Sequence, residues 1–462
     1  MGSNSWREVK LSDLGEVARG RSRHRPRYAE HLYGGEYPFI QTGDIKASEG
    51  RISSHEQTYS EAGLAQSRLW PAGTMCITIA ANIAETGVLQ YPACFPDSVI
   101  GFIADKNKAD VYYIEYVFRK LRKDIQRQAT GSVQDNINLQ TFERLKFKVP
   151  HVEEQHRIAN FLNHFDKKIT LNRQINQTLE QMAQTLFKSW FVDFDPVVDN
   201  ALDAGFFEQD LGFSEELLHR VEVRKTVRKS NNFKPLSENI RRLFPNAFEE
   251  CVESALGLGG WVPKGWNNGC ISDVAHYRTK RINTSELTLT NYISTENMLV
   301  DRKGIQKATA LPTVNSVPAY TSGTILISNI RPYFKKIWLA KGDGGYSNDV
   351  LGFEVKDQGT EEYLFNLMYQ DSFFDFMMAT SKGSKMPRGD KKAILGLELV
   401  VPPLKLRKLF SKNVNGFYTS SSIRNNENHA LGHLRDTLLP KLISGELSLS
   451  NIKIDIPEET LI

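Results

Sequence analysis

The chain has 462 residues, 40% hydrophobic and 24% charged, which is the composition of a core-forming globular protein of about three structural units. The 58 lysine and arginine residues exceed the 54 acidic residues by four, which excludes a histone-like basic polymer but not a local basic patch. The four cysteines (Cys76, Cys94, Cys251 and Cys270) form no CxxC pair, which argues against a zinc ribbon and a disulfide framework.

The beginning of the chain has no basic and apolar leader, and no stretch is apolar for the roughly 18 residues that a membrane span needs. We therefore expect a reduced, cytoplasmic protein that does not enter a membrane.

Two copies of one pattern follow each other along the chain. Trp6 and Trp266 open similar segments, and 99–102 (VIGF) resembles 350–353 (VLGF). From Gly131 onward the offset between the copies is constant, because Gly131 matches Gly383, Pro150 matches Pro402 and Leu186 matches Leu438. An ordered series of matches of this kind indicates an internal repeat.

Each copy has the same two-part organisation. Residues 1–150 and 261–402 contain short β-branched and aromatic runs broken by Gly, Pro and Asn, which predicts two mixed α/β (α+β) globules. Each globule ends at a proline and is followed by a long helical pattern, at 151–195 and at 403–447. Residues 196–260 have no counterpart, and residues 448–462 form a short tail.

The helix over 151–195 carries a heptad seam that runs from Ile158 to Trp190, which is typical of a coiled coil. Such a seam spans roughly 50 Å at 1.5 Å per residue, so we interpret the helix as a spacer whose partner is the second long helix. Asn176 and Asn428 occupy equivalent seam positions, where a buried Asn can fix the register. In the alternative interpretation, both Asn residues face solvent and the helices belong to ordinary bundles.

The stretch at 196–260 begins with acidic residues and continues with basic ones. We interpret it as a partly mobile connector that contains some helix.

Catalytic signatures are absent from the sequence. It contains no GxxxxGK[ST] loop for a nucleotide, no HExxH metal motif and no GxSxG nucleophile elbow. It also lacks the Asn-Pro-Pro-aromatic pocket motif of amino-methyltransferases, and its ten His residues form no ligand cluster. This favours a non-catalytic binding protein without a metal or cofactor of its own.

Basic residues recur at matching places in the two copies. An arginine stands at every second position from Arg19 to Arg27, and an extended segment would align these guanidiniums along one edge, as a row of phosphates requires. The second copy is also basic at the equivalent place. The predicted DNA-binding residues here are Arg19, Arg21, Arg23, Arg25, Arg27, Arg278, Lys280 and Arg281. The alternative is a solvated charged loop.

Polar loops around glycine or asparagine give the second group of candidates. Glycine allows a close backbone approach, Asn can pair with adenine, and Arg can pair with guanine. These candidates are Thr42, Asp44, Asn82, Ser132, Gln134, Asn297, Asn329, Arg331, Tyr333, Lys382, Ser384, Lys385 and Arg388. Such residues also cap turns, which is the alternative for each of them.

The arrangement resembles the specificity subunit of Type I restriction–modification systems, over nearly the whole chain. The segments that carry the resemblance include 6–15 (WREVKLSDLG), 134–138 (QDNIN), 153–162 (EEQHRIANFL), 186–194 (LFKSWFVDF), 243–245 (LFP) and 438–447 (LLPKLISGEL). Two departures are the long stretch 200–242 and Lys405–Lys408, where the second copy lacks the Glu-Glu-Gln of the first.

The resemblance implies two homologous target recognition domains that are separated by two long antiparallel coiled-coil helices, with pseudo-twofold symmetry. Each domain would read one half of an asymmetric bipartite site in double-stranded DNA. Two modification subunits would supply adenine methylation with S-adenosylmethionine, and restriction subunits would use ATP and Mg²⁺. The alternative is a coiled-coil scaffold or DNA-binding adaptor that holds a partner without directing methylation.

Overall fold

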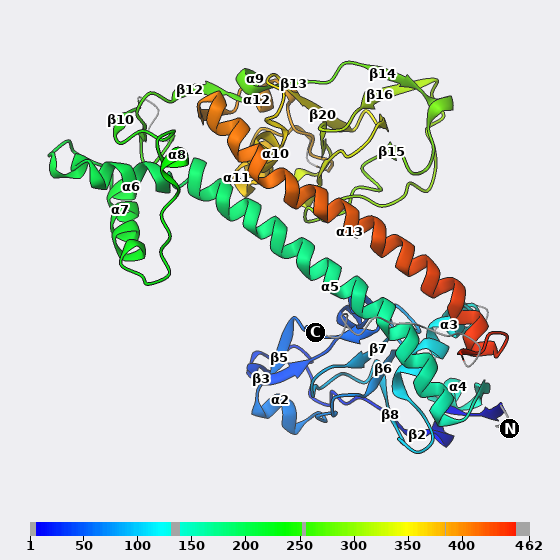
Figure 1. The fold of residues 1–462 in the computed structure, drawn as a ribbon. Helices are drawn as coiled ribbons and strands as arrows, with labels where there is room; N and C mark the ends of the chain where they lie inside the picture. The colour runs from blue at the N-terminus through cyan, green and yellow to red at the C-terminus, as the bar shows by residue number, and fades with distance from the viewer. Residues whose placement is uncertain (1–5, 131–138, 252–255, 384, 450–462) are drawn as a thin grey trace. The chain divides into compact units, whose positions relative to one another are not determined.

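The structure, a computed structural model, describes residues 6–130, 139–251, 256–383 and 385–449, and the chain divides into two compact units. Unit 1 comprises Met1–Asn172 and Asn426–Ile462, and unit 2 comprises Arg173–Asn425. The long helices α5 (Val152–Phe191) and α13 (Leu404–Ser444) each contribute one part to unit 1 and the other part to unit 2 (Figure 1). Both units mix helices with strands, which confirms the predicted fold class.

A five-stranded sheet forms the centre of unit 1, in the order β2-β8-β6-β7-β4. Its neighbours are antiparallel except for the parallel pair β4–β7. All residues of β6 and β7 are buried, so these strands are continuous apolar or small-residue runs without alternation. The strands are β2 (Gly15–Arg19), β4 (Arg51–Ile52), β6 (Met75–Thr78), β7 (Thr86–Leu89) and β8 (Val99–Ala104).

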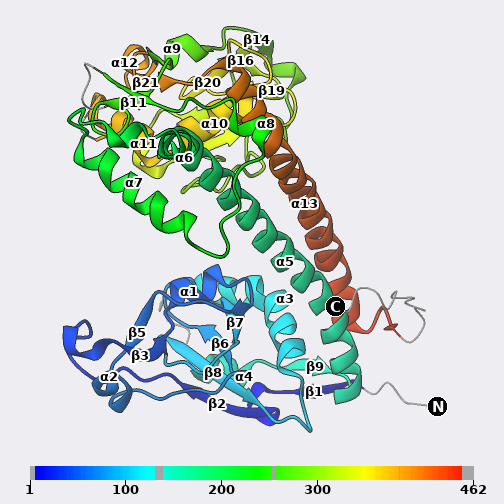
Figure 2. The same cartoon turned by 60° about the vertical axis from the view of Figure 1, so that its left-hand side comes forward.

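Helices α1 and α3 lie against β6 and β7 of this sheet (Figure 2). Two small antiparallel sheets, β1–β9 and β3–β5, complete the unit. The remaining elements are β1 (Arg7–Val9), η1 (Leu11–Asp13), η2 (Glu30–Leu32), β3 (Tyr33–Phe39), α1 (Thr42–Ala47), β5 (Gln57–Tyr59), α2 (Glu61–Ala65), α3 (Val111–Thr130), α4 (Leu139–Arg144) and β9 (Phe147–Val149).

Unit 2 contains a four-stranded antiparallel sheet in the order β13-β20-β17-β18. This order repeats β2-β8-β6-β7 of unit 1, so the internal repeat of the sequence is a repeat of topology. The strands are β13 (Ala275–Tyr277), β17 (Ile325–Ser328), β18 (Ile337–Leu339) and β20 (Val350–Val355).

A second four-stranded sheet, β14-β16-β19-β15, and the pairs β12–β21 and β10–β11 complete the strands of unit 2. The remaining elements of its globule are β12 (Asn267–Cys270), α9 (Ile271–Val274), β14 (Arg281–Asn283), η4 (Thr284–Glu286), β15 (Tyr292–Ile293), β16 (Ser316–Tyr320), η5 (Pro332–Phe334), β19 (Gly344–Tyr346), α10 (Glu361–Tyr369), α11 (Asp371–Ala379), α12 (Lys391–Leu395) and β21 (Glu398–Val401).

The heptad positions of α5 and α13 are buried or half-buried along both helices. In unit 1, Asn172 Nδ2 of α5 donates to Asn428 Oδ1 of α13 at 3.0 Å. In unit 2, Asn176 Nδ2 donates to Asn425 Oδ1, also at 3.0 Å. The partner number falls as the α5 number rises, so the two helices run antiparallel within each unit, and the seam asparagines bond across them.

The stretch expected to be a connector is folded in its described part. It forms α6 (Asp195–Asp203), η3 (Phe206–Glu208), α7 (Glu215–Arg228), α8 (Glu238–Arg241), β10 (Phe248–Glu250) and β11 (Trp261–Pro263). Apolar residues of this stretch, including Val197, Val221 and Phe244, enter one core with Trp190 and Phe410 of the long helices. It is therefore a structural part of unit 2.

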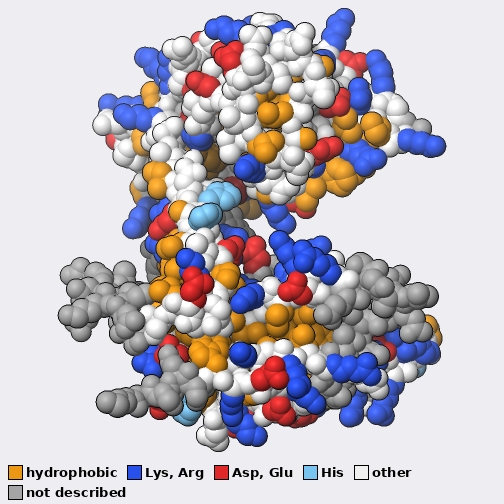
Figure 3. Space-filling view, turned by 90° about the vertical axis from the view of Figure 1, so that its right-hand side faces the viewer, with side chains coloured by type: hydrophobic (Ala, Val, Ile, Leu, Met, Phe, Trp, Pro, Cys, Tyr) orange, Lys and Arg blue, Asp and Glu red, His pale blue; other side chains and the backbone are white. Residues whose placement is uncertain are grey.

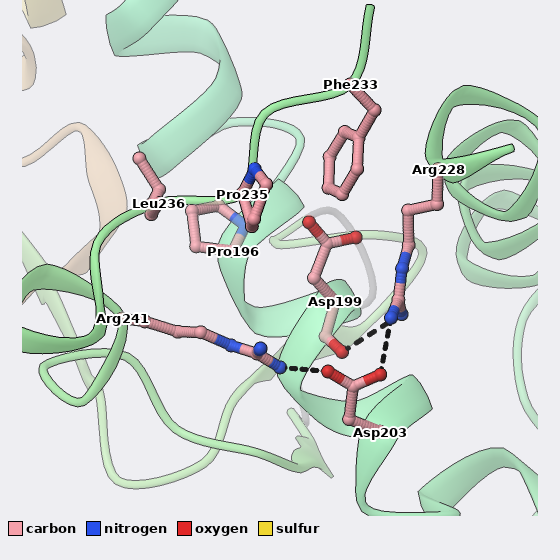
Figure 4. Close-up of a pocket in the computed structure, with 8 residues that line it drawn as sticks. All are labelled: Pro196, Asp199, Asp203, Arg228, Phe233, Pro235, Leu236 and Arg241. Atoms are coloured by element: carbon pink, nitrogen blue, oxygen red, sulfur yellow. Dashed lines mark hydrogen bonds and ion pairs between the residues drawn. The ribbon is translucent and has the colours of Figure 1, made fainter. Parts of the chain in front are cut away.

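The acidic and basic runs of this stretch pair with each other. Three aspartates of α6 bind three arginines of α7 in step: Asp195 with Arg220, Asp199 with Arg224, and Asp203 with Arg228. Arg228 and Arg241 approach Asp203 from different sides (Figure 4), and the Arg228 hydrogen bond holds the pKa of that carboxyl below its usual range. This ladder fixes α7 beside α6.

Each helix in the described part of the chain is too short or too polar to cross a membrane. Most of the expected tail, residues 450–462, lies outside the described residues.

Candidate nucleic-acid interface

One end of the unit 1 sheet carries most of the residues of this unit that are predicted to bind DNA. The strand register pairs Arg19 with Ile100, Thr78 with Val99, and Ile77 with Thr86. The segment after β2, the β6–β7 loop (79–85) and the segment before β8 therefore meet at the same end of the sheet. We call this the unit 1 loop end.

The arginine segment does not form the extended row that the sequence suggested, because β2 ends at Arg19 and an irregular turn follows. Arg19 Nε donates to the Asp97 carbonyl at 3.0 Å, and Arg27 Nη2 binds the Asp97 carboxylate at 2.9 Å. Arg25 Nη1 donates to two backbone carbonyls of its own turn, each at 2.8 Å. Two of the five guanidiniums thus bind Asp97, and a third bonds within its own turn.

Arg21 and Arg23 differ from those three arginines. Their side chains are exposed, and neither guanidinium bonds to another residue in the described part of the chain. Their backbone is held, since Arg21 N donates to the Phe95 carbonyl and Arg23 N donates to Gln66 Oε1. Two free cations on a fixed backbone suit contact with phosphates.

The β6–β7 loop has an unusual backbone, because Ala81, Asn82 and Ala84 all have positive φ angles of 44° to 62°. Each such residue costs of order 1 kcal/mol or more, and such strain gathers at functional sites. Thr78 fixes the loop through its Oγ1, which donates to the Asn82 carbonyl. The exposed Asn82 side chain accepts from Lys46 Nζ at 3.1 Å, so a base edge would compete with that lysine.

Thr42 and Asp44 lie on α1, beside β6 and β7. Asp44 Oδ2 accepts from Gln41 N at 2.7 Å and closes the first turn of the helix, which is a capping role. Thr42 is half-buried at the first position of the helix. Ser132, Gln134 and Ser384 lie outside the described residues.

The same end of the first sheet of unit 2 is built in the same way. Tyr277 pairs with Phe353, Ser328 with Val350, and Ile327 with Ile337. The segment after β13, the β17–β18 loop (329–336) and the segment before β20 therefore meet, and we call this the unit 2 loop end.

Two loops that are distant in sequence combine at the unit 2 loop end. Arg331 N donates to the Pro387 carbonyl at 2.8 Å, and Gly389 N donates to the Asn329 carbonyl at 3.3 Å. Arg331, Lys385 and Tyr333 are exposed on the two loops, and Tyr333 retains 48% of its accessible surface. Arg331 and Lys335 have positive φ angles of 51° and 49°, so this loop is strained like its counterpart in unit 1.

Acidic neighbours neutralise part of the charge at this end. Lys382 Nζ lies 2.7 Å from Asp390, and Arg388 lies 3.1 Å from Asp349. The hydrogen bond from Lys382, supported by two backbone N–H groups, lowers the pKa of Asp390 to about 2. On the face in Figure 3, lysine and arginine side chains are likewise interspersed with acidic ones on both units.

Three further candidates of the second copy use their polar groups within the domain, and a fourth, Asn329, is buried with no hydrogen-bond partner for its Oδ1 among the described residues. Arg278 is buried, donates to the Ala319 carbonyl at 2.6 Å and pairs with Glu354 at 3.0 Å. The buried Asn297 bonds to three surrounding residues through both ends of its amide. Arg281 donates to Ser316, and Asn329 is only 8% exposed. The side chains of Arg278, Asn297 and Arg281 therefore have partners inside the domain, whereas Lys280 is exposed.

This chain is similar to known proteins in both sequence and fold. A family model, that of the Type I restriction modification DNA specificity domain, matches residues 4–181. The MjaIX specificity subunit of Methanocaldococcus jannaschii, a Type I restriction enzyme subunit, is 25% identical over 97% of this chain and 94% of its own length. The HindI specificity subunit of Haemophilus influenzae is 25% identical over 67% of this chain and 71% of its own length.

Residues 4–181 thus match the DNA specificity domain of Type I restriction–modification systems. The crystal structure of a Type I S subunit from M. genitalium shares the fold with a TM-score of 0.52, at 14% identity, over 96% of this chain and 97% of that one. The family model ends at residue 181, within α5, and the repeated strand order extends the same architecture to the second globule of this chain.

Several residues that support the loop ends were not predicted from the sequence. Lys46 binds Asn82, Arg122 pairs with Glu85 at 2.8 Å, and Gln126 Nε2 donates to the Ile83 carbonyl at 2.8 Å. At the unit 2 loop end, Lys335 and Arg302 both bind Asp371. The helical spacing of Arg122 and Gln126 on α3 was the available signal, but it did not reveal which loop they contact. In the described ranges, no group of three or more His, Cys, Asp or Glu residues is placed to hold a metal ion.

Proposed function

We propose that this chain is the specificity subunit of a Type I restriction–modification complex and reads an asymmetric bipartite site in double-stranded DNA, with each loop end contacting one half of the site. The observation that carries the proposal is the repeated loop end. The same strand order presents different side chains in the two units: Arg21, Arg23 and Asn82 in unit 1, and Arg331 and Lys385 in unit 2. Because the residues differ while the scaffold repeats, the two half-sites differ.

The chemistry in this proposal belongs to partner proteins. The subunit is non-catalytic and cytoplasmic, and it docks two modification subunits that bind S-adenosylmethionine and methylate adenine. Restriction subunits that bind ATP and Mg²⁺ complete the complex. The printed names of the relatives, which describe specificity subunits of Type I restriction enzymes, support this assignment.

A methylation map tests the proposal. DNA from cells that express this chain with its modification subunit is expected to carry methyladenine only within one asymmetric bipartite motif. Cells that lack this chain provide the control and should lose the modification. If the complex assembles and methylation does not depend on this chain, the alternative of a scaffold or adaptor is favoured.

The free cations of the unit 1 loop end give a quantitative prediction. In the assembled complex, the double variant Arg21→Gln/Arg23→Gln is expected to bind DNA more weakly, with a slope of log affinity against log salt reduced by about two, since each lost phosphate contact removes about one. Binding would be measured by fluorescence anisotropy at several salt concentrations.

The matched control is Lys106→Gln/Lys148→Gln, which also removes two exposed charges from unit 1. Lys106 follows the opposite end of β8, and Lys148 lies on β9. The control should bind with the slope of the unmodified protein. An unchanged slope in the arginine variant would show that these guanidiniums do not touch phosphates.

A further inference from the structure

Five charged side chains of unit 1 meet where its globule packs on the two long helices. Glu115 and Arg119 come from α3, Arg51 from β4, Asp166 from α5 and Arg435 from α13. Glu115 binds Arg119 at 2.6 Å and Arg51 at 3.3 Å. Asp166 binds Arg435 at 2.5 Å and lies 3.5 Å from Arg119. We call these five residues the junction cluster.

The two carboxylates of the junction cluster are buried, its three arginines are half-buried, and all five are hydrogen-bonded. Glu115 has no exposed surface, and Asp166 retains 7% of its surface. Burial disfavours the ionised form of Asp166, but Arg119 and Arg435 outweigh it and hold the pKa of this carboxyl below its usual range. Removing one of the two carboxylates leaves three arginines beside a single carboxylate, and the excess positive charge is then uncompensated.

The junction cluster also holds the backbone on which the unit 1 loop end is built. Glu115 Oε1 accepts from Thr86 Oγ1 at 2.9 Å, and Thr86 is the residue that directly follows the strained β6–β7 loop. Arg119 Nη2 donates to the Glu49 carbonyl at 2.8 Å, in the turn that follows α1. A Cβ atom on Gly50 would lie 1.8 Å from the same Nη2 atom, so this turn packs directly on the guanidinium.

Unit 2 has a polar cluster of different chemistry at the equivalent place. Glu115 and Arg119 match Asn366 and Gln370 at the offset that joins 99–102 to 350–353, and Asp166 matches Tyr418 at the offset that joins Gly131 to Gly383. Asn366 Oδ1 accepts from Gln184 at 2.7 Å and from Tyr418 at 2.9 Å. Gln370 donates to Gln184 at 2.8 Å. Amides and a phenol thus occupy the places of ion pairs.

We propose that Arg435 is a positioning residue for DNA reading by unit 1, through the chain of contacts Asp166, Arg119, Glu115 and Thr86. This inference rests on the proposed function. α13 lies far from the unit 1 globule in sequence, and Arg435 is its charged contact to the cluster that anchors the reading loop. Without the Arg435 guanidinium, Arg119 interacts differently with Asp166 and Glu115. Thr86, which Glu115 binds at the end of the β6–β7 loop, then moves.

The variant Arg435→Met tests this role, because methionine keeps an apolar side chain of similar length and removes the charged guanidinium with its hydrogen-bond donors. In the assembled complex, preference for the correct bases is expected to fall about tenfold at one half-site and to stay within about twofold at the other. Base preference would be read at every position by sequencing DNA selected by the complex. The second variant is Arg435→Lys, which keeps the positive charge but loses the paired donors of the guanidinium. Its base preference should fall less at the same half-site.

The matched control is Tyr418→Phe, which removes the hydrogen bond to Asn366 at the equivalent place of unit 2. It is expected to leave the half-site that Arg435→Met affects unchanged. The positioning role is overturned if either Arg435 variant loses base preference equally at both half-sites. It is also overturned if neither variant loses base preference. If the unmodified complex itself shows no sequence preference, the proposed function fails and not this inference alone.

Discussion

Replacement of Asp166 by asparagine is expected to lower the free energy of unfolding by about 3–5 kcal/mol, the usual result of removing one partner from a buried charge network. Asp166 accepts from Tyr116 at 2.6 Å and binds Arg435 at 2.5 Å, with 7% of its surface exposed. The neutral amide leaves three arginines beside a single carboxylate, Glu115. Urea denaturation measures the loss, and hydrogen exchange should locate it in α3 and β7.

The control for this prediction is Lys168→Ala on the same helix. Lys168 lies 3.7 Å from Glu427, and about half of its side chain is exposed. An exposed pair of this kind contributes at most about 1 kcal/mol. If Asp166→Asn costs no more than Lys168→Ala, the junction cluster does not hold unit 1 together.

The pH dependence of this loss has a definite sign. The folded-state pKa of Asp166 is lowered from its usual value of 3.8, so its ionised form stabilises the fold fully above that value. The stabilisation disappears as the pH falls through the lower, folded-state pKa. The difference in unfolding free energy between the unmodified protein and Asp166→Asn should therefore be constant from neutral pH to about pH 4, and it should shrink at more acidic pH.

Periodic features of this fold can be predicted from the sequence. The helix expected over 151–195 is α5, Val152–Phe191, because the heptad seam and Pro150 at its start are local signals. The apolar runs at 75–79 and 99–103 correspond to the strands β6 and β8. The internal repeat is found by aligning the chain with itself. The sequence therefore also predicted that one topology would occur twice.

Features that depend on tertiary pairing could not be predicted in the same way. The alternation of arginines at 19–27 suggested an extended row, but Asp97, which lies far along the chain, binds two of them. Asn297 looked like a candidate for base contact, whereas both ends of its amide are satisfied inside the domain. Composition gives the charge of a segment and not its partner, and the partner decides whether a cation is free for DNA.

In residues 196–260, the stretch after α5, the partners of the charged residues could not be predicted from composition either. Its acidic and basic runs suggested a partly mobile connector with some helix, but each run lies on its own helix at a spacing of four residues, so the two faces are complementary. The apolar residues between the charges then enter the core of unit 2. Phe244 packs edge-on against Trp190 of α5, with ring centroids 5.2 Å apart, and Phe410 of α13 contacts the same indole at 6.1 Å.

If this stretch is a true part of the core, Trp190→Ala should destabilise three segments at once. Trp190 retains 2% of its surface, and loss of a buried tryptophan costs about 3–5 kcal/mol through lost contacts and the remaining cavity. Hydrogen exchange is expected to increase together in α6, α7 and the first turns of α13, because all three border this core. Leu218→Ala on α7, where the leucine is 45% exposed, is the control and should change the stability by no more than about 0.5 kcal/mol. A connector that is independent of the core would leave α7 unchanged in Trp190→Ala, so protection of α7 distinguishes the two descriptions of residues 196–260.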